Sequence, residues 1–215
     1  MTTLDKIEKS YDAIAAKWAN AFSDEHSGKP KDREWLRWFA REIRSGGKVL
    51  DLACGPGNTS RLLADLDVDV TGVDLSQNFI REAKKRHGDI PFEQGNMLAL
   101  KYADASMAGI VCFYGIVHFC ADQMGKAFNE VYRILEDKGI FMCTFHLGTE
   151  QIHMTEFLGE TVDVDFYMYA SEFVVDKLRQ SGFQQVAVVE RDPYPDIEYQ
   201  SRRAYVFARK ASLAS

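Results

Sequence analysis

Two glycines and an acidic residue stand close together between an apolar stretch and a helical pattern. The segment from Asp51 to Gly57 reads Asp-Leu-Ala-Cys-Gly-Pro-Gly. Glycines at a tight turn let a ligand approach the backbone closely, and the helix N-terminus behind them favours an anionic or polar ligand group. A plain turn also contains glycine, so this segment alone leaves that alternative open.

Another acidic residue, Asp74, ends the next apolar stretch. It follows the glycine-rich turn by about 20 residues, the spacing of dinucleotide folds in which a carboxylate binds the ribose hydroxyls. The alternative is an aspartate that caps the next helix. Ser76 already offers that cap, which favours ribose binding by Asp74.

A third polar segment, Gln94 to Met97, follows a further short strand pattern. The amide of Asn96 can recognise an adenine edge, and Met97 can pack on the face of the ring. A simple turn role for Asn96 is the alternative.

Histidines supply the candidate bases. His118 directly follows a long apolar run, titrates near neutral pH and can act as a general base. Alternatively it orients the cofactor or substrate, or only packs at the strand end. Tyr114 in the same run is expected to line the pocket. His146, His153 and Glu156 match no recognised metal-ligand spacing, so no metal is expected.

The elements that must position these residues alternate between strand and helix patterns from residue 48 onward. Strands are expected at 49–53, 68–75, 91–95, 107–117, 139–145, 183–190 and 203–208, and helices at 58–64, 76–87, 123–135 and 171–180. For the helix at 58–64, Asn58 or Thr59 is the expected N-cap. This alternation predicts an α/β fold whose mainly parallel sheet has helices on both faces and binds ligands beyond the carboxyl ends of its strands. The last two strands have no clear helix between them and can pair antiparallel at one edge.

Two further segments flank this pattern. The first 45 residues or so carry two amphipathic helices around a polar loop, and the second helix is expected to stop at Ser45-Gly46-Gly47. An insert at about 148–169, rich in aromatic and acidic residues, is expected to cover the substrate, although a packed surface excursion remains open. The prediction is a single domain, 1–215, with an N-terminal helical cap (about 1–45) and this lid.

The stretches VLDLACGPG, GVDLS and EQGNM, in this order, resemble the motifs of class I S-adenosylmethionine-dependent methyltransferases. The resemblance extends over roughly Tyr11 to Ala208. It implies a Rossmann-like, seven-stranded, mostly parallel sheet whose last strand is antiparallel. It also implies S-adenosylmethionine as cofactor and methyl transfer to a small-molecule nucleophile.

The resemblance further implies which residues bind the cofactor. Asp51, Gly55 and Gly57 would surround its methionine portion, Asp74 its ribose, and Asn96 with Met97 its adenine. Tyr11-Asp12-x-x-Ala15-x-x-Trp18 is similar to a segment that closes over the cofactor in many small-molecule members, which places Tyr11 and Trp18 near the sulfonium. The remaining expected cofactor contacts are Ala53, Pro56, Leu75 and Tyr114, and the expected catalytic residues are His118 and Tyr11.

This sequence departs from the common family pattern in two places. Asn96 stands where an aspartate is usual, and it keeps a hydrogen-bond acceptor while adding a donor. Met107-Ala108 stands where Phe-Asp is common, which we interpret as structural variation without catalytic meaning.

Two rival functions remain. A nicotinamide-dependent oxidoreductase fits less well, because Ser60 occupies the third glycine position and Asp51 would repel a pyrophosphate. A non-catalytic S-adenosylmethionine-binding protein is the second rival. A turnover assay separates it from an enzyme.

Composition limits the partners and the compartment. The 215 residues carry a formal net charge of −6, which argues against a nucleic acid or an anionic membrane as partner. Neither a secretory signal nor a membrane-spanning apolar stretch is evident, and the four cysteines form no CxxC pair. A cytoplasmic protein with a small-molecule substrate is therefore expected, as a monomer or a homodimer.

Overall fold

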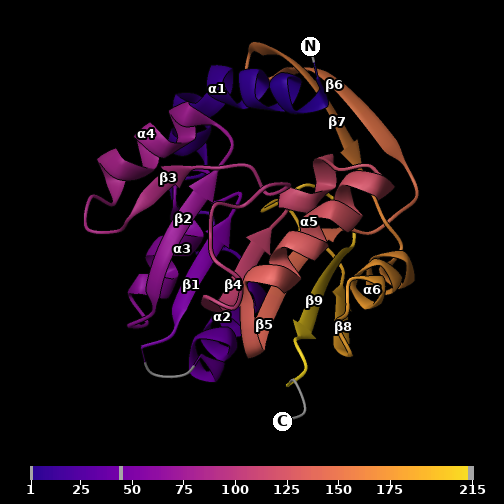
Figure 1. The fold of residues 1–215 in the computed structure, drawn as a ribbon. Coiled ribbons are helices and arrows are strands. Elements are labelled where there is room, and N and C mark those ends of the chain that lie inside the picture. Colours follow the sequence, from indigo (N-terminus) through magenta and orange to yellow (C-terminus); the bar gives the residue numbers. More distant parts are fainter. Residues whose placement is uncertain (1, 44–45, 213–215) are drawn as a thin grey trace.

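The core of the protein is a seven-stranded sheet with the strand order β3-β2-β1-β4-β5-β9-β8 (Figure 1). The structure is a computed structural model that describes residues 2–43 and 46–212. The strands are β1 (Lys48–Leu52), β2 (Asp69–Asp74), β3 (Phe92–Gln94), β4 (Met107–Phe113), β5 (Leu135–His146), β8 (Gln185–Arg191) and β9 (Arg203–Arg209). β9 runs antiparallel to both of its neighbours, and the other pairs are parallel. The predicted α/β fold with an antiparallel last strand is confirmed.

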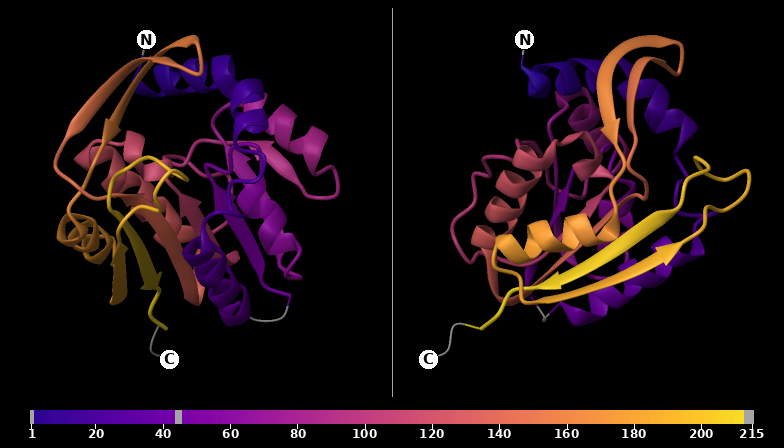
Figure 2. Two further views of the ribbon diagram at one scale, coloured as in Figure 1. Left: turned by 180° about the vertical axis from the view of Figure 1, so that it is seen from behind. Right: turned by 90° about the vertical axis from the view of Figure 1, so that its right-hand side faces the viewer.

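Helices cover both faces of this sheet (Figure 2). On one face, α5 (Ala121–Ile134) and α6 (Ser171–Gln180) bury their apolar side chains in a large core cluster. On the other face, α2 (Pro30–Glu42), α3 (Asn58–Ala64) and α4 (Gln77–Arg86) contribute to a second cluster. β4 lies at the centre and is buried along nearly its whole length, as expected for a strand covered on both faces.

The carboxyl edge of the sheet is covered by two elements that are distant in sequence. Helix α1 (Thr3–Ala21) lies against a two-stranded hairpin made of β6 (Gln151–Phe157) and β7 (Glu160–Tyr167). Figure 1 shows both elements together above the ends of the parallel strands. Ile7 and Ile14 of α1 pack on Val162 and Val164 of the hairpin, forming a third apolar cluster.

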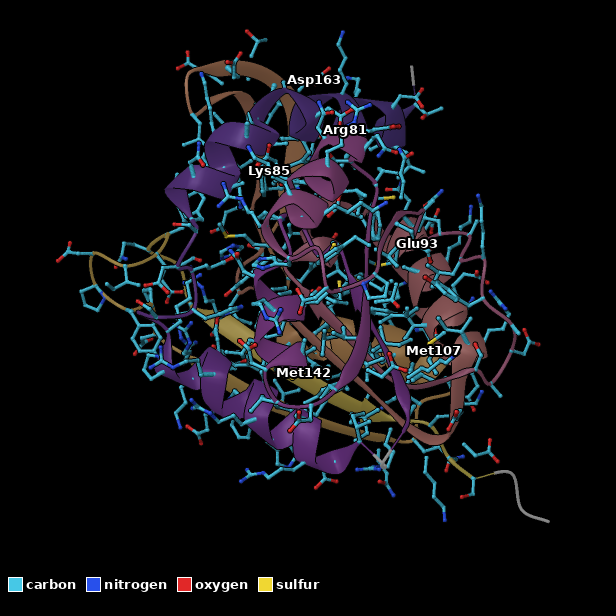
Figure 3. The ribbon with its side chains drawn as sticks, turned by 90° about the vertical axis from the view of Figure 1, so that its left-hand side faces the viewer. Arg81, Lys85, Glu93, Met107, Met142 and Asp163 are labelled. Atoms are coloured by element: carbon cyan, nitrogen blue, oxygen red, sulfur yellow. The ribbon has the colours of Figure 1, made fainter. Side chains whose placement is uncertain are left out.

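Exposed ion pairs border the contact between α1 and the hairpin. Lys6 pairs with Asp163 at 2.8 Å and Lys17 with Glu160 at 2.7 Å; Asp163 is labelled beside α1 in Figure 3. All four side chains remain at least 41% exposed, so each pair contributes little stability and the apolar cluster holds the two elements together. The predicted insert therefore folds as an ordered hairpin packed on the N-terminal helix.

Three local predictions were wrong or extend beyond the described residues. The strand expected at 107–117 ends at Phe113, because Tyr114 adopts a left-handed φ of +58° and starts the 3-10 helix η1 (Gly115–His118). The N-cap of α3 is Gly57 rather than Asn58 or Thr59. The side chain of Asn58 instead donates to the backbone oxygen of Phe22. α2 ends at Glu42, and the predicted stop at Ser45 lies outside the described residues.

Within residues 2–43 and 46–212, no helix is both long and apolar enough to cross a lipid bilayer.

Candidate functional site

A cavity of about 780 Å³ lies at the carboxyl edge of the sheet, below α1 and the hairpin. Its size is typical of sites that bind small molecules. Most of the residues predicted from the sequence line it: Tyr11, Trp18, Ala53, Gly55, Pro56, Asp74, Leu75, Asn96, Met97, Tyr114 and His118. Asp51 and Gly57, by contrast, are not among the described lining residues. The fold thus brings α1, four strand ends and the hairpin to one cavity.

The two glycines of the turn after β1 have different surroundings. Gly55 has a φ of +52°, and a side-chain carbon added there would meet no described atom within 4 Å. Gly57 has a φ of +90°, and an added carbon would lie 2.8 Å from the ring of Phe92. Gly55 therefore exposes backbone to the cavity, whereas Gly57 is required by packing on the sheet side.

Asp51 lies beneath this turn. It is 1% exposed and accepts a hydrogen bond from Oγ of Ser60 at 2.6 Å. Burial raises the pKa of Asp51 to about 7, since no solvent stabilises the charged form. From this position Asp51 supports the turn through Ser60, one layer below the cavity surface.

Asp74 joins the ends of β1 and β2. Its Oδ2 accepts from the backbone nitrogen of Gly55 at 2.9 Å, and its Oδ1 accepts from that of Ser76 at 2.8 Å. Burial raises the pKa of Asp74 to about 6. A carboxylate oxygen can accept a second hydrogen bond, so both oxygens keep capacity for a ligand.

The helix after β2 begins at the predicted cap. Oγ of Ser76 accepts from the backbone nitrogen of Phe79, which confirms Ser76 as the N-cap of α4. The same hydroxyl donates to Asp12 at 2.5 Å, and Asp12 also accepts from the backbone nitrogen of Asn78. These bonds attach α1 to the strand end that carries Asp74, a role for Asp12 that sequence reasoning missed.

The segment after β3 forms a turn at the cavity. Oδ1 of Asn96 accepts from the backbone nitrogen of Leu98 at 2.9 Å, while its Nδ2 has no hydrogen-bond partner among the described residues. Met97 is 8% exposed and also lines the cavity. Asn96 therefore has the turn role and still offers a free donor.

Tyr11 and His118 form a hydrogen-bonded pair inside the cavity. The Tyr11 hydroxyl lies 2.7 Å from Nε2 of His118, and Nδ1 of His118 lies 2.9 Å from the backbone oxygen of Asp165. A carbonyl oxygen only accepts, so Nδ1 carries the proton and Nε2 of the neutral ring accepts from Tyr11. Burial lowers the pKa of His118 to about 4, which keeps the ring neutral near pH 7. Burial, with the nearby Asp74 charge, raises the pKa of Tyr11 above its usual value.

Tyr114 is held by a buried arginine that sequence reasoning missed. Nε of Arg203 donates to the Tyr114 hydroxyl at 3.0 Å and lies 3.1 Å from Glu198. Arg203 is only 2% exposed, and both it and Glu198 line the cavity. Their positions in the strand β9 and the loop before it carry no local motif, so no sequence signal pointed to them.

The histidines considered as metal ligands have separate partners. Nδ1 of His146 lies 2.6 Å from Oγ of Ser201, and His153 pairs with Asp165 at 2.9 Å. Across the described residues, no group of three or more His, Cys, Asp or Glu side chains is arranged to hold a metal ion.

The cavity residues fit the cofactor implied by the sequence motifs. Asp74 offers acceptors for a pair of ribose hydroxyls, and the amide of Asn96 offers a donor for a base edge. The open backbone at Gly55 gives room for the amino-acid portion of a nucleoside cofactor. These groups lie at the ends of the neighbouring strands β1, β2 and β3.

Comparisons with known proteins point to methyltransferases. A family described as "Methyltransferase domain" matches residues 49–139, which include the glycine turn, Asp74, Asn96 and His118. A demethylmenaquinone methyltransferase of Paenarthrobacter aurescens is 31% identical over 137 residues, or 63% of this chain and 53% of that protein. The chain spans about half the length of the first curated relatives it matches.

Solved structures share the fold at low sequence identity. A SAM-dependent methyltransferase from Methanosarcina mazei has a TM-score of 0.69 at 16% identity, covering 80% of this chain and 95% of that one. The structure of the [4+2]-cyclase SpnF has a TM-score of 0.74 at 16% identity, covering 98% and 97%. Residues 49–139 thus match the methyltransferase domain family, and the chain as a whole has the fold of the S-adenosylmethionine-dependent methyltransferases to which it is similar.

Proposed function

We propose that this protein transfers the methyl group of S-adenosylmethionine to a small-molecule nucleophile. The observation that carries the proposal is that the Tyr11–His118 pair faces the same cavity as Asp74 and Gly55. A cofactor seated on the strand ends would thus lie beside a hydrogen-bonded pair able to take a proton.

The cofactor is assigned to the carboxyl ends of β1, β2 and β3. In this assignment Asp74 binds the ribose hydroxyls, Asn96 and Met97 the adenine, and the backbone at Gly55 the methionine portion. Asp51 acts indirectly, because it lies below the turn and holds Ser60 at the start of α3. Trp18 and Tyr11 close the site from α1.

When bound, S-adenosylmethionine supplies an activated methyl group on a sulfonium. The protein then has to align the nucleophile and remove its proton, if it carries one. The Tyr11 hydroxyl donates to Nε2 of His118, so the lone pairs of the Tyr11 oxygen remain for the acceptor. In this proposal the Tyr11 oxygen takes the proton of the methyl acceptor. At the same time the hydroxyl proton of Tyr11 moves to Nε2 of His118.

The hairpin β6–β7 is assigned the role of a lid. Met154, Phe157 and Phe166 of the hairpin line the cavity, and Phe157 packs on Trp18 with ring centroids 5.4 Å apart. Such an arrangement excludes water from the sulfonium and from the Tyr11–His118 pair. The relatives named as demethylmenaquinone methyltransferases support a small-molecule acceptor.

Titration calorimetry and a turnover assay test this proposal. S-adenosylmethionine and S-adenosylhomocysteine are expected to bind, and NAD is not. Formation of S-adenosylhomocysteine is then followed over a panel of small metabolites, and at least one is expected to accelerate it. Binding of NAD but of neither sulfur nucleoside would overturn the proposal, and binding without turnover of any metabolite would favour a non-catalytic binding protein.

A further inference from the structure

The loop between α1 and α2 forms one wall of the cavity. Nδ2 of Asn58 donates to the backbone oxygen of Phe22 in this loop at 2.8 Å, and Nε2 of His26 lies 3.1 Å from Oγ1 of Thr59. Asn58 and Thr59 are the first two residues of α3, which follows the turn at Gly55. The loop is therefore fixed beside the turn that is assigned to the methionine portion of the cofactor.

This loop carries a mostly buried ion pair. Nζ of Lys29 lies 2.9 Å from Oε1 of Glu25, and the side chains of Lys29 and Glu25 are only 10% and 25% exposed. Both residues line the cavity. Nζ of Lys29 also lies 5.9 Å from the centre of the Tyr114 ring, at the end of β4. A ligand that passes over the turn at Gly55 would thus have both charges of this pair within the same cavity.

The stability of the fold does not by itself account for the pair. Lysine is almost never buried without a partner, and taking two charges out of water costs about as much free energy as their attraction returns. Glu25 is nevertheless ionised. Burial raises its pKa, but the charge of Lys29, with contributions from His26 and Asn58, outweighs this and holds the pKa below its usual value. A charged pair at a cavity surface indicates a ligand that carries charges of its own.

Both members of the pair keep hydrogen-bonding capacity. An ammonium has three donors and a carboxylate about four acceptor sites, but among the described residues Nζ of Lys29 donates only to Glu25. Arg203 is the other lysine or arginine of the described lining, and its guanidinium nitrogens already donate to the Tyr114 hydroxyl and to two backbone oxygens. Lys29 is therefore the cation of the described lining that has donors left for a ligand.

We propose that the Glu25–Lys29 pair binds the charged end of the cofactor, with the α-ammonium on Glu25 and the α-carboxylate on Lys29. The inference rests on the proposed methyl transfer, because it adds residues to the same cofactor site. The two charged groups of an α-amino acid are attached to one carbon, so against this pair the four charges alternate in sign. Each buried charge then has an opposite neighbour and no net charge is buried. The pair would select nucleosides that carry an amino-acid chain over those that lack one.

Calorimetry with the full chain and four thioethers of 5′-deoxyadenosine tests the assignment. S-adenosylhomocysteine carries both charges, the 3-aminopropyl thioether only the ammonium, the 3-carboxypropyl thioether only the carboxylate, and the methyl thioether neither. We expect the wild type to bind S-adenosylhomocysteine at least about tenfold more tightly than the methyl thioether, since one hydrogen bond between charged groups is worth that much. Equal affinity for these two ligands would overturn the inference.

Variants separate the two charges. Lys29→Met should weaken binding of S-adenosylhomocysteine and of the carboxypropyl thioether by about tenfold or more, but not binding of the aminopropyl thioether. Glu25→Gln should weaken binding of S-adenosylhomocysteine and of the aminopropyl thioether, but not of the carboxypropyl thioether. Lys29→Arg keeps the charge and should retain most of the preference for a carboxylate. A variant that weakens all four ligands by the same factor would act only through the shape of the loop, and that result would overturn the inference.

An exposed ion pair on α2 provides the matched controls. Nζ of Lys31 lies 2.7 Å from Glu34, the two side chains are 49% and 53% exposed, and neither residue belongs to the described cavity lining. Lys31→Met and Glu34→Gln should bind all four ligands as the wild type does. The affinity for the methyl thioether also shows whether each variant is folded, because this ligand contacts neither charge of the pair.

The outcomes separate this inference from the proposed function. Failure of the wild type to bind any of the four nucleosides would contradict the methyltransferase proposal itself. Wild-type affinity for S-adenosylhomocysteine in both Lys29→Met and Glu25→Gln would overturn only the role of the pair.

Discussion

The Tyr11 hydroxyl lies 2.7 Å from Nε2 of His118, although 107 positions separate the two residues. Tyr11 is in α1, and His118 ends the 3-10 helix that follows β4. Their rings also meet edge to face, with centroids 5.2 Å apart. Helix α1 is therefore part of the proposed catalytic site as well as its cover.

Removal of the Tyr11 hydroxyl tests the proton path. Tyr11→Phe keeps the ring contacts, and it should lower kcat by about 10²–10⁴-fold, the usual contribution of a positioned acid or base. His118→Ala should have a similar effect, with little change in affinity for S-adenosylhomocysteine. Because the two residues act as a unit, the double variant should be about as slow as either single one.

Steady-state kinetics with an accepted metabolite, together with calorimetry, checks this prediction. Tyr132→Phe serves as the control, since Tyr132 packs beside Phe183, and its ring does not belong to the described cavity lining. An unchanged kcat in Tyr11→Phe would remove the pair from the mechanism.

Asp74→Ala should weaken binding of S-adenosylmethionine by about 1–3 kcal/mol, the typical loss when buried polar groups are left without partners. The backbone nitrogens of Gly55 and Ser76 also lose their acceptor, so the free energy of unfolding should fall as well. Asp74→Asn retains one carbonyl oxygen and should lie between the wild type and the alanine variant. Calorimetry measures the affinity, and a value equal to that of the wild type in Asp74→Ala would refute the ribose assignment.

The buried Asp51 should make stability depend on pH. Its folded pKa of about 7 lies above the reference value of 3.8, so between these pH values the folded protein holds the proton more firmly than the unfolded chain does. This contribution to the free energy of unfolding is complete below pH 4 and is lost as the pH rises through 7.

Asp51→Asn cannot titrate at this position. Between pH 4 and pH 8 its free energy of unfolding should therefore rise relative to that of the wild type, by at most about 4 kcal/mol. Urea unfolding of both proteins at pH 4 and at pH 8 measures the difference between their free energies of unfolding. The contributions of the other titrating groups are common to both proteins and cancel in this difference. A difference that is independent of pH would contradict a protonated Asp51 in the folded protein.

The two glycines of the turn should respond differently to alanine. Gly57→Ala forces a side chain into a left-handed conformation and onto Phe92, so it should destabilise the fold by more than the roughly 1–2 kcal/mol of the backbone alone. Gly55→Ala also places a side chain in a left-handed backbone conformation, but it causes no clash. Its methyl group points into the space assigned to the cofactor. It should therefore lose more affinity for S-adenosylhomocysteine than stability.

Thermal unfolding and calorimetry distinguish the two cases. Equal losses of affinity in both variants would show that the turn is affected as a whole, and that the surroundings of the two glycines do not matter.

Local patterns were sufficient for most of the fold. The helices at 58–64 and 171–180 lie where the apolar spacing predicts them, and Ser76 is the cap that its side chain predicts. These features depend on residues within a few positions of each other. The end of β4 was placed wrongly, because the left-handed Tyr114 is not a residue type that signals a turn.

The cavity lining was predictable where a motif marks a strand end, and at Tyr11 and Trp18, where the N-terminal segment resembles a known family. Asp74, Asn96 and the turn at Gly55 could be assigned, because a parallel sheet places the carboxyl ends of its strands at one edge. The depth of Asp51 and the packing of Gly57 against Phe92 could not, since both depend on which side of the turn faces the sheet.

The sequence by itself determined the α/β fold and the strand ends that carry the motifs, because backbone propensity and hydrophobic periodicity are local properties. The cofactor was indicated by the resemblance of those motifs to a known family. Only the tertiary structure decided that Tyr11 meets His118, that Arg203 holds Tyr114, and that His146 meets Ser201. Each of these contacts joins residues at least 55 positions apart. They arise from the packing of α1, β9 and the loops against the sheet, which no local pattern encodes.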